Sequence, residues 1–247
     1  MKTQAIVVSV LLGLISAPIL AHPEQEARIA ALEAKLAAVT NETVNGQPTV
    51  RFSGVNVQIV NGTKSTWSSN GRGNLILGYD LARNDGTFFC SEGFYATYET
   101  CSIGGRRTWA VSHKSGSHYL VIGDSNNYSR YGGVVVGSFN TSNGAYASVS
   151  GGFNNTASGQ YASVSGGGGN TASGSFASVS GGGGNTASGS SASVSGGWDN
   201  TASSILSSVS GGRGNTASGY NSSVSGGYFR TAIGDYDWVT GGLFQDY

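Results

Sequence analysis

Hydrophobic and polar residues alternate in a fixed fifteen-residue unit through the C-terminal half of the chain. Three successive copies between 155 and 199 are nearly identical: NTASGQYASVSGGGG, NTASGSFASVSGGGG and NTASGSSASVSGGWD. One valine recurs in eight windows without insertion or deletion, at Val134, Val149, Val164, Val179, Val194, Val209, Val224 and Val239. Such a period predicts stacked, near-identical units, each of which needs its neighbours to bury its apolar residues.

The length of the unit fits one coil of a parallel β-solenoid. Helical repeats need about 33 residues and propeller blades about 40. Within a unit, the segment 162–165 (ASVS) alternates small apolar and polar residues, so Ala162 and Val164 share one face of a strand. Gly166 and Gly167 then supply a turn. A flexible Gly/Ser linker is the rival interpretation, but a register kept over eight copies disfavours it. We therefore predict an all-β solenoid whose core contains the recurring valines.

Stacking places equivalent residues of successive coils about 4.8 Å apart. Asparagine recurs at 140, 155, 170, 185, 200 and 215, which predicts a ladder of side-chain amides bonded along the solenoid axis. The inward side chains of the repeats are only alanine and valine, so the core is thin and buries little apolar area per residue. Backbone ladders and neighbouring chains are therefore expected to supply much of the stability.

A helical pattern precedes the β region, over residues 24–39, within a predicted short coiled-coil segment 22–44. Its apolar residues follow the three- and four-residue spacing of a coiled-coil seam: Ile29, Leu32, Leu36 and Val39. Arg28 and Glu33 fall at the flanking g and e positions, where they can pair between helices. Two heptads are too few to be stable alone. The segment is predicted either to pack on one end of the solenoid or to form an oligomerisation coil of three chains.

Residues 45–124 read as an irregular β entry region, followed by the solenoid and its C-terminal cap at 125–247. Strands are predicted at 55–60, 74–79 and 118–124. The segment LVIG at 120–123 resembles VVVG fourteen residues later, so the solenoid is expected to start before the clean repeats, with bulkier residues in its bore.

An insertion at about 81–114 interrupts this entry region. It contains Cys90 and Cys101, which are predicted to form a disulfide in an exported protein. It also contains a cluster of candidate binding residues: Phe88, Phe89, Phe94, Tyr95, Tyr98 and Trp109. Aromatic side chains on a tethered loop suit carbohydrate or protein contact, and they suit equally a small satellite core that caps the solenoid.

The first 21 residues have the pattern of a secretory signal peptide. Lys2 is followed by an apolar stretch at 5–15, and Ala21 is a plausible cleavage position. The stretch is shorter than the roughly 20 residues that span a bilayer. We therefore predict a secreted or cell-surface protein with no membrane span in the mature chain.

Charge is sparse, with a formal net charge of +0 and only Asp199 and Arg213 charged between 140 and 227. No basic patch predicts a nucleic-acid partner. His113 and His118 lack nearby carboxylates or cysteines arranged for a metal, and no serine lies in a G-x-S-x-G elbow. The sequence therefore predicts no enzyme activity, no metal and no cofactor. A polysaccharide lyase on a β-helix is disfavoured, because the coils lack the charged groups of such a groove.

Two outward-facing positions of the repeats carry larger side chains. One position holds Tyr146, Tyr161, Phe176 and Leu206, and the other holds Phe153, Trp198, Arg213 and Tyr228. Together they predict a sparse apolar stripe suited to packing against sister chains. The last coil, 230–244, replaces small residues with Asp235, Tyr236, Asp237 and Trp238. It is predicted either to cap the rod or to dock another copy end to end.

The units NTASGQYASVSGG and NTASGSFASVSGG resemble the head repeats of trimeric autotransporter adhesins, the YadA-like heads. The resemblance covers about half the chain, from Ser117 to Gly242, and implies a left-handed parallel β-roll that trimerises. Two departures are expected to matter: those adhesins continue into a membrane barrel, which is not found after Gly242, and their heads precede their stalks. The resemblance thus implies the fold and a homotrimer more than it implies adhesion.

The leading hypothesis is an exported, non-enzymatic structural or adhesive protein: a trimeric solenoid rod that binds a host surface, matrix or glycan, or assembles end to end. The alternative is a solenoid that binds a ligand. That ligand is either carbohydrate, through the aromatic insertion, or ice, through the threonine row from Thr141 to Thr231.

Overall fold

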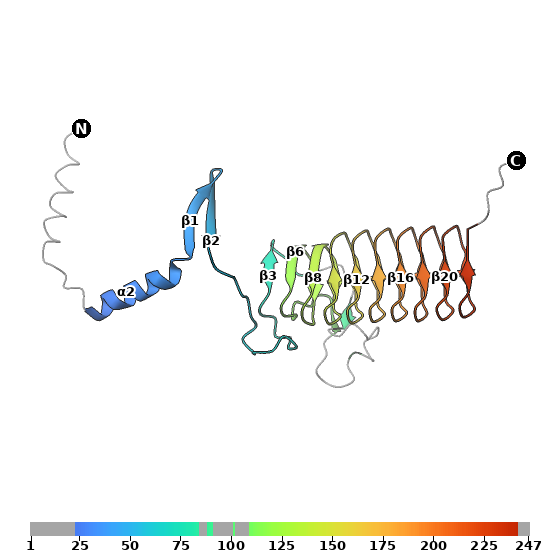
Figure 1. The fold of residues 1–247 in the computed structure, drawn as a ribbon, viewed down its shortest axis with the longest axis horizontal. Helices are drawn as coiled ribbons and strands as arrows, with labels where there is room; N and C mark the ends of the chain where they lie inside the picture. The colour runs from blue at the N-terminus through green and yellow to red at the C-terminus, as the bar shows by residue number, and fades with distance from the viewer. Residues whose placement is uncertain (1–22, 84–87, 91–100, 102–108, 242–247) are drawn as a thin grey trace. The chain divides into compact units, whose positions relative to one another are not determined.

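The computed structural model describes residues 23–83, 88–90, 101 and 109–241 and divides the chain into two compact units, Met1–Gln58 and Ile59–Tyr247. The second unit is a parallel β-solenoid of about eight turns, so the predicted fold class is confirmed (Figure 1). No helix in the described part of the chain is long and apolar enough to cross a bilayer.

The first unit contains one helix and one β-hairpin. Helix α2 (Pro23–Leu36) is followed by β1 (Val39–Val44) and β2 (Gln47–Phe52), which pair antiparallel. The two-residue loop has positive φ at both Asn45 (51°) and Gly46 (79°), the type I′ geometry that Asn-Gly favours between twisted strands. The prediction that Val39 belongs to the helix is therefore wrong: Val39 opens β1, where β-branched residues are favoured.

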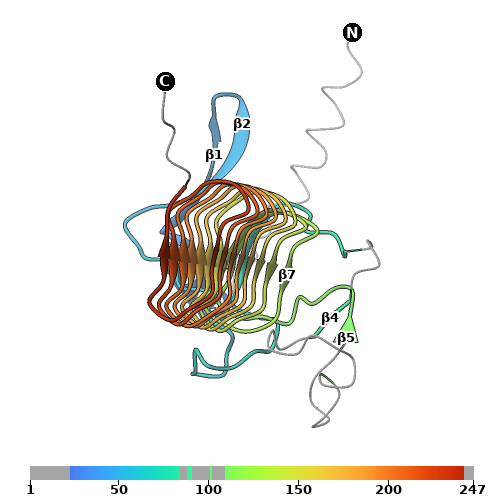
Figure 2. The ribbon, with the colours of Figure 1, turned by 90° about the vertical axis from the view of Figure 1, so that its right-hand side faces the viewer.

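The solenoid has two parallel sheets on opposite sides of a narrow bore (Figure 2). The serine–valine sheet contains β3 (Leu75–Leu77), β6 (Leu120–Asp124), β8 (Val134–Ser138), β10 (Ser148–Val149), β12 (Ser163–Val164), β14 (Ser178–Val179), β16 (Ser193–Val194), β18 (Ser208–Val209), β20 (Ser223–Val224) and β22 (Trp238–Val239). The threonine–alanine sheet contains β7 (Asn127–Tyr128), β9 (Thr141–Ser142), β11 (Thr156–Ala157), β13 (Thr171–Ala172), β15 (Thr186–Ala187), β17 (Thr201–Ala202), β19 (Thr216–Ala217) and β21 (Thr231–Ala232).

The recurring valines form the core, with one correction at each end of the row. Six of them are at most 1 % exposed: Val149, Val164, Val179, Val194, Val209 and Val224. Val239 is half-buried in the last coil. Val134 is also only half-buried, because β8 pairs Val135, not Val134, with Val149. Val135 is fully buried and takes the core position predicted for Val134.

This correction locates the change from a fourteen-residue to a fifteen-residue coil. Strands β6 and β8 pair over five residues, and Ser138 at the end of β8 then bridges to Phe153. Val135 and Ser138 are three residues apart, whereas their partners Val149 and Phe153 are four apart. One extra residue after the valine thus divides the long strand of the early coils into a two-residue strand and an isolated bridge in the later ones.

The asparagine ladder exists, but most of its bonds reach the backbone. In the coil that begins at Asn155, Nδ2 donates to the carbonyl oxygens of Gly151 (3.2 Å) and Gly167 (3.0 Å). Asn155 Oδ1 accepts from the backbone N–H of Asn170 at 3.0 Å. The pattern repeats up to Asn215, and the asparagines are fully buried. Each amide therefore joins two neighbouring coils and satisfies polar groups that the thin core cannot.

The core of the first coils contains larger side chains than the core of the repeats, as expected from the sequence. Tyr119 and Tyr128 are buried with ring centroids 5.4 Å apart, and the Tyr119 hydroxyl donates to the Ser142 carbonyl oxygen at 3.0 Å. Burial raises the pKa of Tyr119 to about 12.

The strand predicted at 55–60 is absent from the structure, and residues 53–74 contain no strand. A polar loop centred on buried Asn61 follows instead. The Asn61 amide donates to Ser65 and Ser68, and its oxygen accepts from Thr63 at 3.0 Å. Of the other two predicted strands, 74–79 corresponds to β3 and 118–124 to β6.

The close stacking at the ladder predicts unequal effects for two adjacent glycines. Gly167 has φ of 86°, and a Cβ there would collide with the Gly182 carbonyl oxygen and lie 2.7 Å from Asn170 Nδ2. We expect Gly167→Ala to lower the free energy of unfolding by about 2–4 kcal/mol in urea denaturation. A Cβ on Gly166 meets nothing within 4 Å, so Gly166→Ala should change it by less than about 0.5 kcal/mol. Equal effects of the two substitutions would contradict this packing.

Candidate functional site

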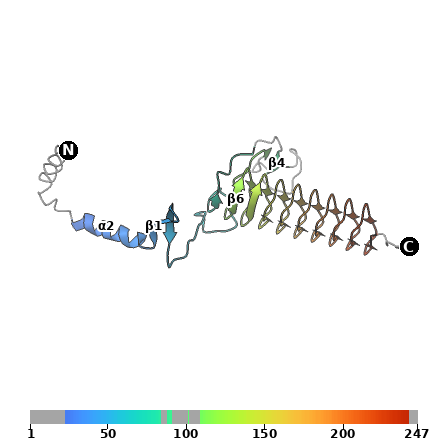
Figure 3. The same cartoon turned by 90° about the horizontal axis from the view of Figure 1, so that it is seen from above.

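The insertion carries the predicted disulfide. Cys90 and Cys101 are buried and bonded, with Sγ atoms 2.10 Å apart. Strand β4 (Phe89–Cys90) pairs antiparallel with β5 (Trp109–Ala110), and Figure 3 shows β4 beside the first coils of the solenoid. The disulfide therefore joins Cys101 to β4, one of the two paired strands of the insertion.

The aromatic candidates of the insertion are described only in part. The side chain of Phe88 is exposed, and Phe89 and Trp109 contribute backbone to β4 and β5. Phe94, Tyr95 and Tyr98 lie outside the described residues. The binding cluster and the satellite core both stay predictions.

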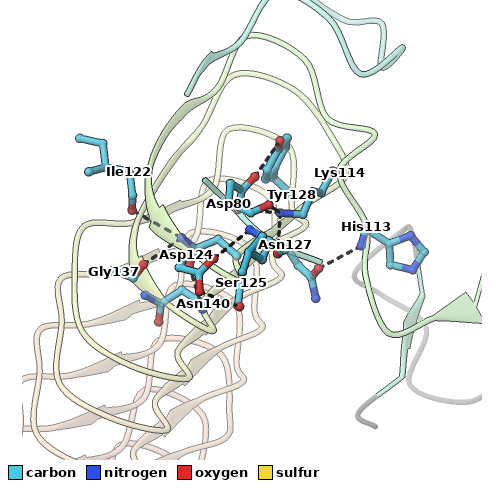
Figure 4. A network of polar contacts seen from close by, with 12 residues as sticks. Asp80, His113, Lys114, Ile122, Asp124, Ser125, Asn127, Tyr128, Gly137 and Asn140 are labelled. Carbon is cyan, nitrogen blue, oxygen red and sulfur yellow. Dashed lines mark hydrogen bonds and ion pairs between the residues drawn. The ribbon is translucent and has the colours of Figure 1, made fainter. Parts of the chain in front are cut away.

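A polar cluster that the sequence did not single out fastens the two ends of the insertion to the solenoid (Figure 4). We call Asp80, Lys114 and Tyr128 the clasp. Lys114 Nζ lies 2.6 Å from Asp80 Oδ1 and also donates to the carbonyl oxygens of Asp80 and Leu81, the latter at 3.0 Å. The Tyr128 hydroxyl donates to Asp80 Oδ2 at 3.2 Å. The ammonium group is thus held by one ion pair with Asp80 and by two carbonyl acceptors.

The clasp is largely withdrawn from water. The Asp80 side chain is 4 % exposed and that of Lys114 is 25 % exposed. Burial, followed by the neighbouring Asp80 carboxylate, raises the pKa of Tyr128 well above its ordinary 10.0, so the phenol stays a hydrogen-bond donor. The clasp therefore joins Asp80, directly before the insertion, to Lys114, its last residue, through a shielded ion pair.

Three more hydrogen bonds hold the first residues of the insertion, 81–83, against the coils. The backbone N–H of Leu81 donates to Asp124 Oδ1 at 2.8 Å, and this bond lowers the pKa of Asp124. Arg83 is buried and donates to Thr141 Oγ1 at 3.0 Å and to Asn154 Oδ1 at 2.8 Å. Arg83 therefore covers the first threonine of the threonine–alanine sheet.

The two histidines at and after the end of the insertion, His113 and His118, have structural roles through their backbone. His113 is buried, and its backbone N–H donates to Asn127 Oδ1 at 2.9 Å, which places residue 113 at the edge of β7. His118 has φ of 60° at a corner of the first coil. Within the described residues, no group of three or more histidine, cysteine, aspartate or glutamate side chains could hold a metal ion.

The threonines of the repeats form one row along the outer face of the threonine–alanine sheet. Pairing brings Thr141, Thr156, Thr171, Thr186, Thr201, Thr216 and Thr231 into a single register. Thr141 is buried beneath Arg83, the next five are half-buried, and Thr231 is exposed. The available row thus starts where the insertion contacts end.

The larger outward side chains also line up, at two corners of the coil. Phe153, Gly168, Gly183, Trp198, Arg213 and Tyr228 form one continuous set of bridges. At the other corner, Tyr146, Tyr161 and Phe176 stack ring on ring, with centroids 5.4 and 5.0 Å apart. Because its two neighbours cover both faces of the Tyr161 ring, that ring presents only its edge, whereas sugar rings pack best on open aromatic faces.

The predicted seam of the helix is open to solvent. Ile29, Leu32 and Leu36 are between 54 and 59 % exposed, and no residue of α2 is buried. Val39, the fourth predicted seam residue, lies on β1 and is half-buried. The seam, the two corner rows and the threonine row are thus all available for association.

Comparison of the chain with family models, with curated proteins and with solved structures gave no match. Its function therefore has to be inferred from these surfaces.

The clasp predicts that replacement of Lys114 strongly lowers the free energy of unfolding. Lys114→Met leaves the Asp80 carboxylate buried without its counterion and should lower the free energy of unfolding by about 2–3 kcal/mol, allowing for the part of Lys114 that water reaches. Arg51 and Glu42 form an exposed pair of similar length, 2.8 Å, so Arg51→Met should cost about 0–1 kcal/mol.

Limited proteolysis with mass spectrometry provides a second measurement on the same variants. Cleavage between residues 81 and 114 should accelerate in Lys114→Met and stay at the wild-type rate in Arg51→Met. An unchanged cleavage rate in Lys114→Met would show that the clasp does not hold the insertion.

Proposed function

We propose that this is an exported, non-enzymatic structural or adhesive protein in which three chains associate and bind through repeated surfaces. The observation that carries the proposal is that residues 23–58 contain no buried residue at all. Fewer than about 40 residues rarely fold without a metal, disulfides or association, and none of these residues is a cysteine. Association with sister chains supplies the burial that this unit lacks.

The coiled-coil seam favours identical partners over an unrelated one. Ile29, Leu32 and Leu36 keep heptad spacing and are all exposed. A two-heptad helix is marginal alone, and knobs-into-holes packing against copies of itself stabilises such a seam. The resemblance of the repeats to heads that trimerise supports three copies.

Export is supported by the bonded cysteines together with the signal-like N-terminal sequence. Cys90 and Cys101 are both buried and paired, which is typical of proteins that mature in an oxidising compartment.

A binding role is supported by the outward rows of the solenoid. Phe153, Trp198 and Tyr228 are each exposed on one corner, and the sheets between the corners present hydroxyl groups with almost no charge. Repetition lets a weak contact recur along a polymer or surface, so avidity can exceed the affinity of any single coil.

Sedimentation of the full-length secreted chain tests the association. The wild type should have the mass of three chains. Leu32→Asp, at a seam position, should shift it to monomer, because a carboxylate at the centre of a coiled coil is desolvated. Ala34→Asp, on the outer side of the helix, should leave it trimeric. A wild-type chain that sediments as a compact monomer and binds no surface, matrix or partner would refute the proposal.

A second candidate function is ice binding, which one observation favours: the threonine row keeps a single register over the flat threonine–alanine sheet. The spacing along the row is about 4.8 Å and is set by the backbone ladder. A rigid, regular set of methyl and hydroxyl groups can match a crystalline surface.

Thermal hysteresis measurements test whether the threonine row binds ice. If the row binds ice, Thr171→Tyr should abolish the activity, because the ring interrupts the flat face. Ser178→Tyr, in the same turn but on the serine–valine sheet, should retain it. Absence of hysteresis in the wild type, or equal loss in both variants, excludes the threonine row as an ice-binding face.

A further inference from the structure

The hairpin of the first unit has one polar and one apolar face. Residues directly opposite each other in an antiparallel pair lie on the same face. The pairs Thr40–Arg51, Glu42–Thr49 and Val44–Gln47 make a mainly polar face, on which Arg51 and Glu42 form an ion pair. The other face consists of Val39, Asn41, Thr43, Pro48, Val50 and Phe52, and we call it the apolar hairpin face.

The apolar hairpin face is open to solvent at its largest side chains. Val50 is 57 % exposed and Phe52 is 54 % exposed. On the polar face, in contrast, Glu42 and Thr49 are both half-buried. The chain thus leaves a valine and a phenylalanine about as exposed to water as the arginine of the ion pair, an arrangement that is unfavourable for an isolated hairpin.

The exposed face follows directly from the helical seam. Leu36 is the last residue of α2, and Val39, three residues later, is the first residue of β1 and lies on the apolar hairpin face. The three-residue spacing of the seam in the sequence therefore reaches the first residue of the strand. Only two alanines separate Leu36 from Val39, so the seam ends directly before the first residue of the hairpin face.

From this continuity we propose that the apolar hairpin face packs against the same face of two further copies of this chain, forming a small three-chain core at the end of the coiled coil. The inference rests on the proposed trimer and adds a second element to its interface. Identical parallel helices with Arg28 and Glu33 at g and e positions bring the three hairpins to the same level. Each hairpin then meets its own counterpart.

The hairpin face enlarges the apolar surface available to a trimer. Ile29, Leu32, Leu36, Val50 and Phe52 are each slightly more than half exposed. At roughly 100 Å² for each side chain, three chains offer about 1,500 Å² from these residues, or about 500 Å² for each of the three pairwise contacts. The helix alone contributes about three fifths of this total, so the hairpin face enlarges the apolar contact by about two thirds.

The test uses the full-length chain and two double variants. Val50→Ser with Phe52→Ser removes the apolar hairpin face. Thr40→Ser with Thr49→Ser is the control, because it introduces serine at two positions of the same hairpin but removes only one methyl group from each, on the polar face. In sedimentation equilibrium, the first variant should dissociate from trimer to monomer at a protein concentration at least about 100-fold higher than the wild type, and the second should match the wild type.

Hydrogen exchange of the unmodified chain provides a measurement that does not depend on the variants. Amide protons of β1 and β2 should be protected at concentrations where the trimer forms and should lose protection on dilution, while protection of the solenoid strands stays constant. Loss of protection only in the hairpin and helix would support the inference.

The outcomes separate this inference from the proposed function. If the wild type is a trimer and both double variants form trimers of equal stability, the role of the hairpin face is overturned and the coiled-coil trimer stays intact. A hairpin whose amides stay protected in the monomer also overturns it, because the face is then covered within one chain. A monomeric wild type overturns the trimer and the hairpin interface together.

Discussion

The structure depends on the close approach of successive coils at the corner occupied by glycine and asparagine. The Gly182 carbonyl oxygen occupies the space where a Cβ on Gly167 would lie, and Asn170 Nδ2 donates to that same oxygen at 3.0 Å. The missing side chain and the buried amide are therefore two parts of one contact. Because inward alanine and valine bury little area, this contact and the backbone ladders keep the coils in register.

The repeat made the main features of the solenoid predictable, because one physical environment recurs in every turn. A valine that recurs every fifteen residues and an asparagine in the same register are constrained by the same neighbours above and below. The prediction was wrong where the turn length changes. Residues 134–136 are all valine, so Val134 falls at the fifteen-residue spacing by coincidence. Only the strand pairing shows that Val135 is the equivalent of Val149.

Features without repetition were harder to predict. The hairpin had a usable signal, the Asn45-Gly46 pair between β-branched residues, but the heptad spacing through Val39 competed with it. The clasp had none, because Asp80 and Lys114 are 34 residues apart and no local pattern joins them. Long-range polar pairs are set by tertiary structure, so the charged residues that border an insertion are the only sequence feature that could indicate them.

The corner rows show how local strain can be tolerated in a stack. Tyr146, Tyr161 and Phe176 all have positive φ, between 57° and 60°, a conformation that disfavours bulky side chains. Their rings pack on one another across coils, and this contact offsets part of the strain. At Ser191, where φ is 56°, no ring continues the stack, so the stack belongs to the coils next to the insertion. The aromatic stack, the clasp and the bulky core residues thus lie together at the end of the solenoid next to the insertion, and the repeats, which carry almost no charge, extend from it as a regular surface.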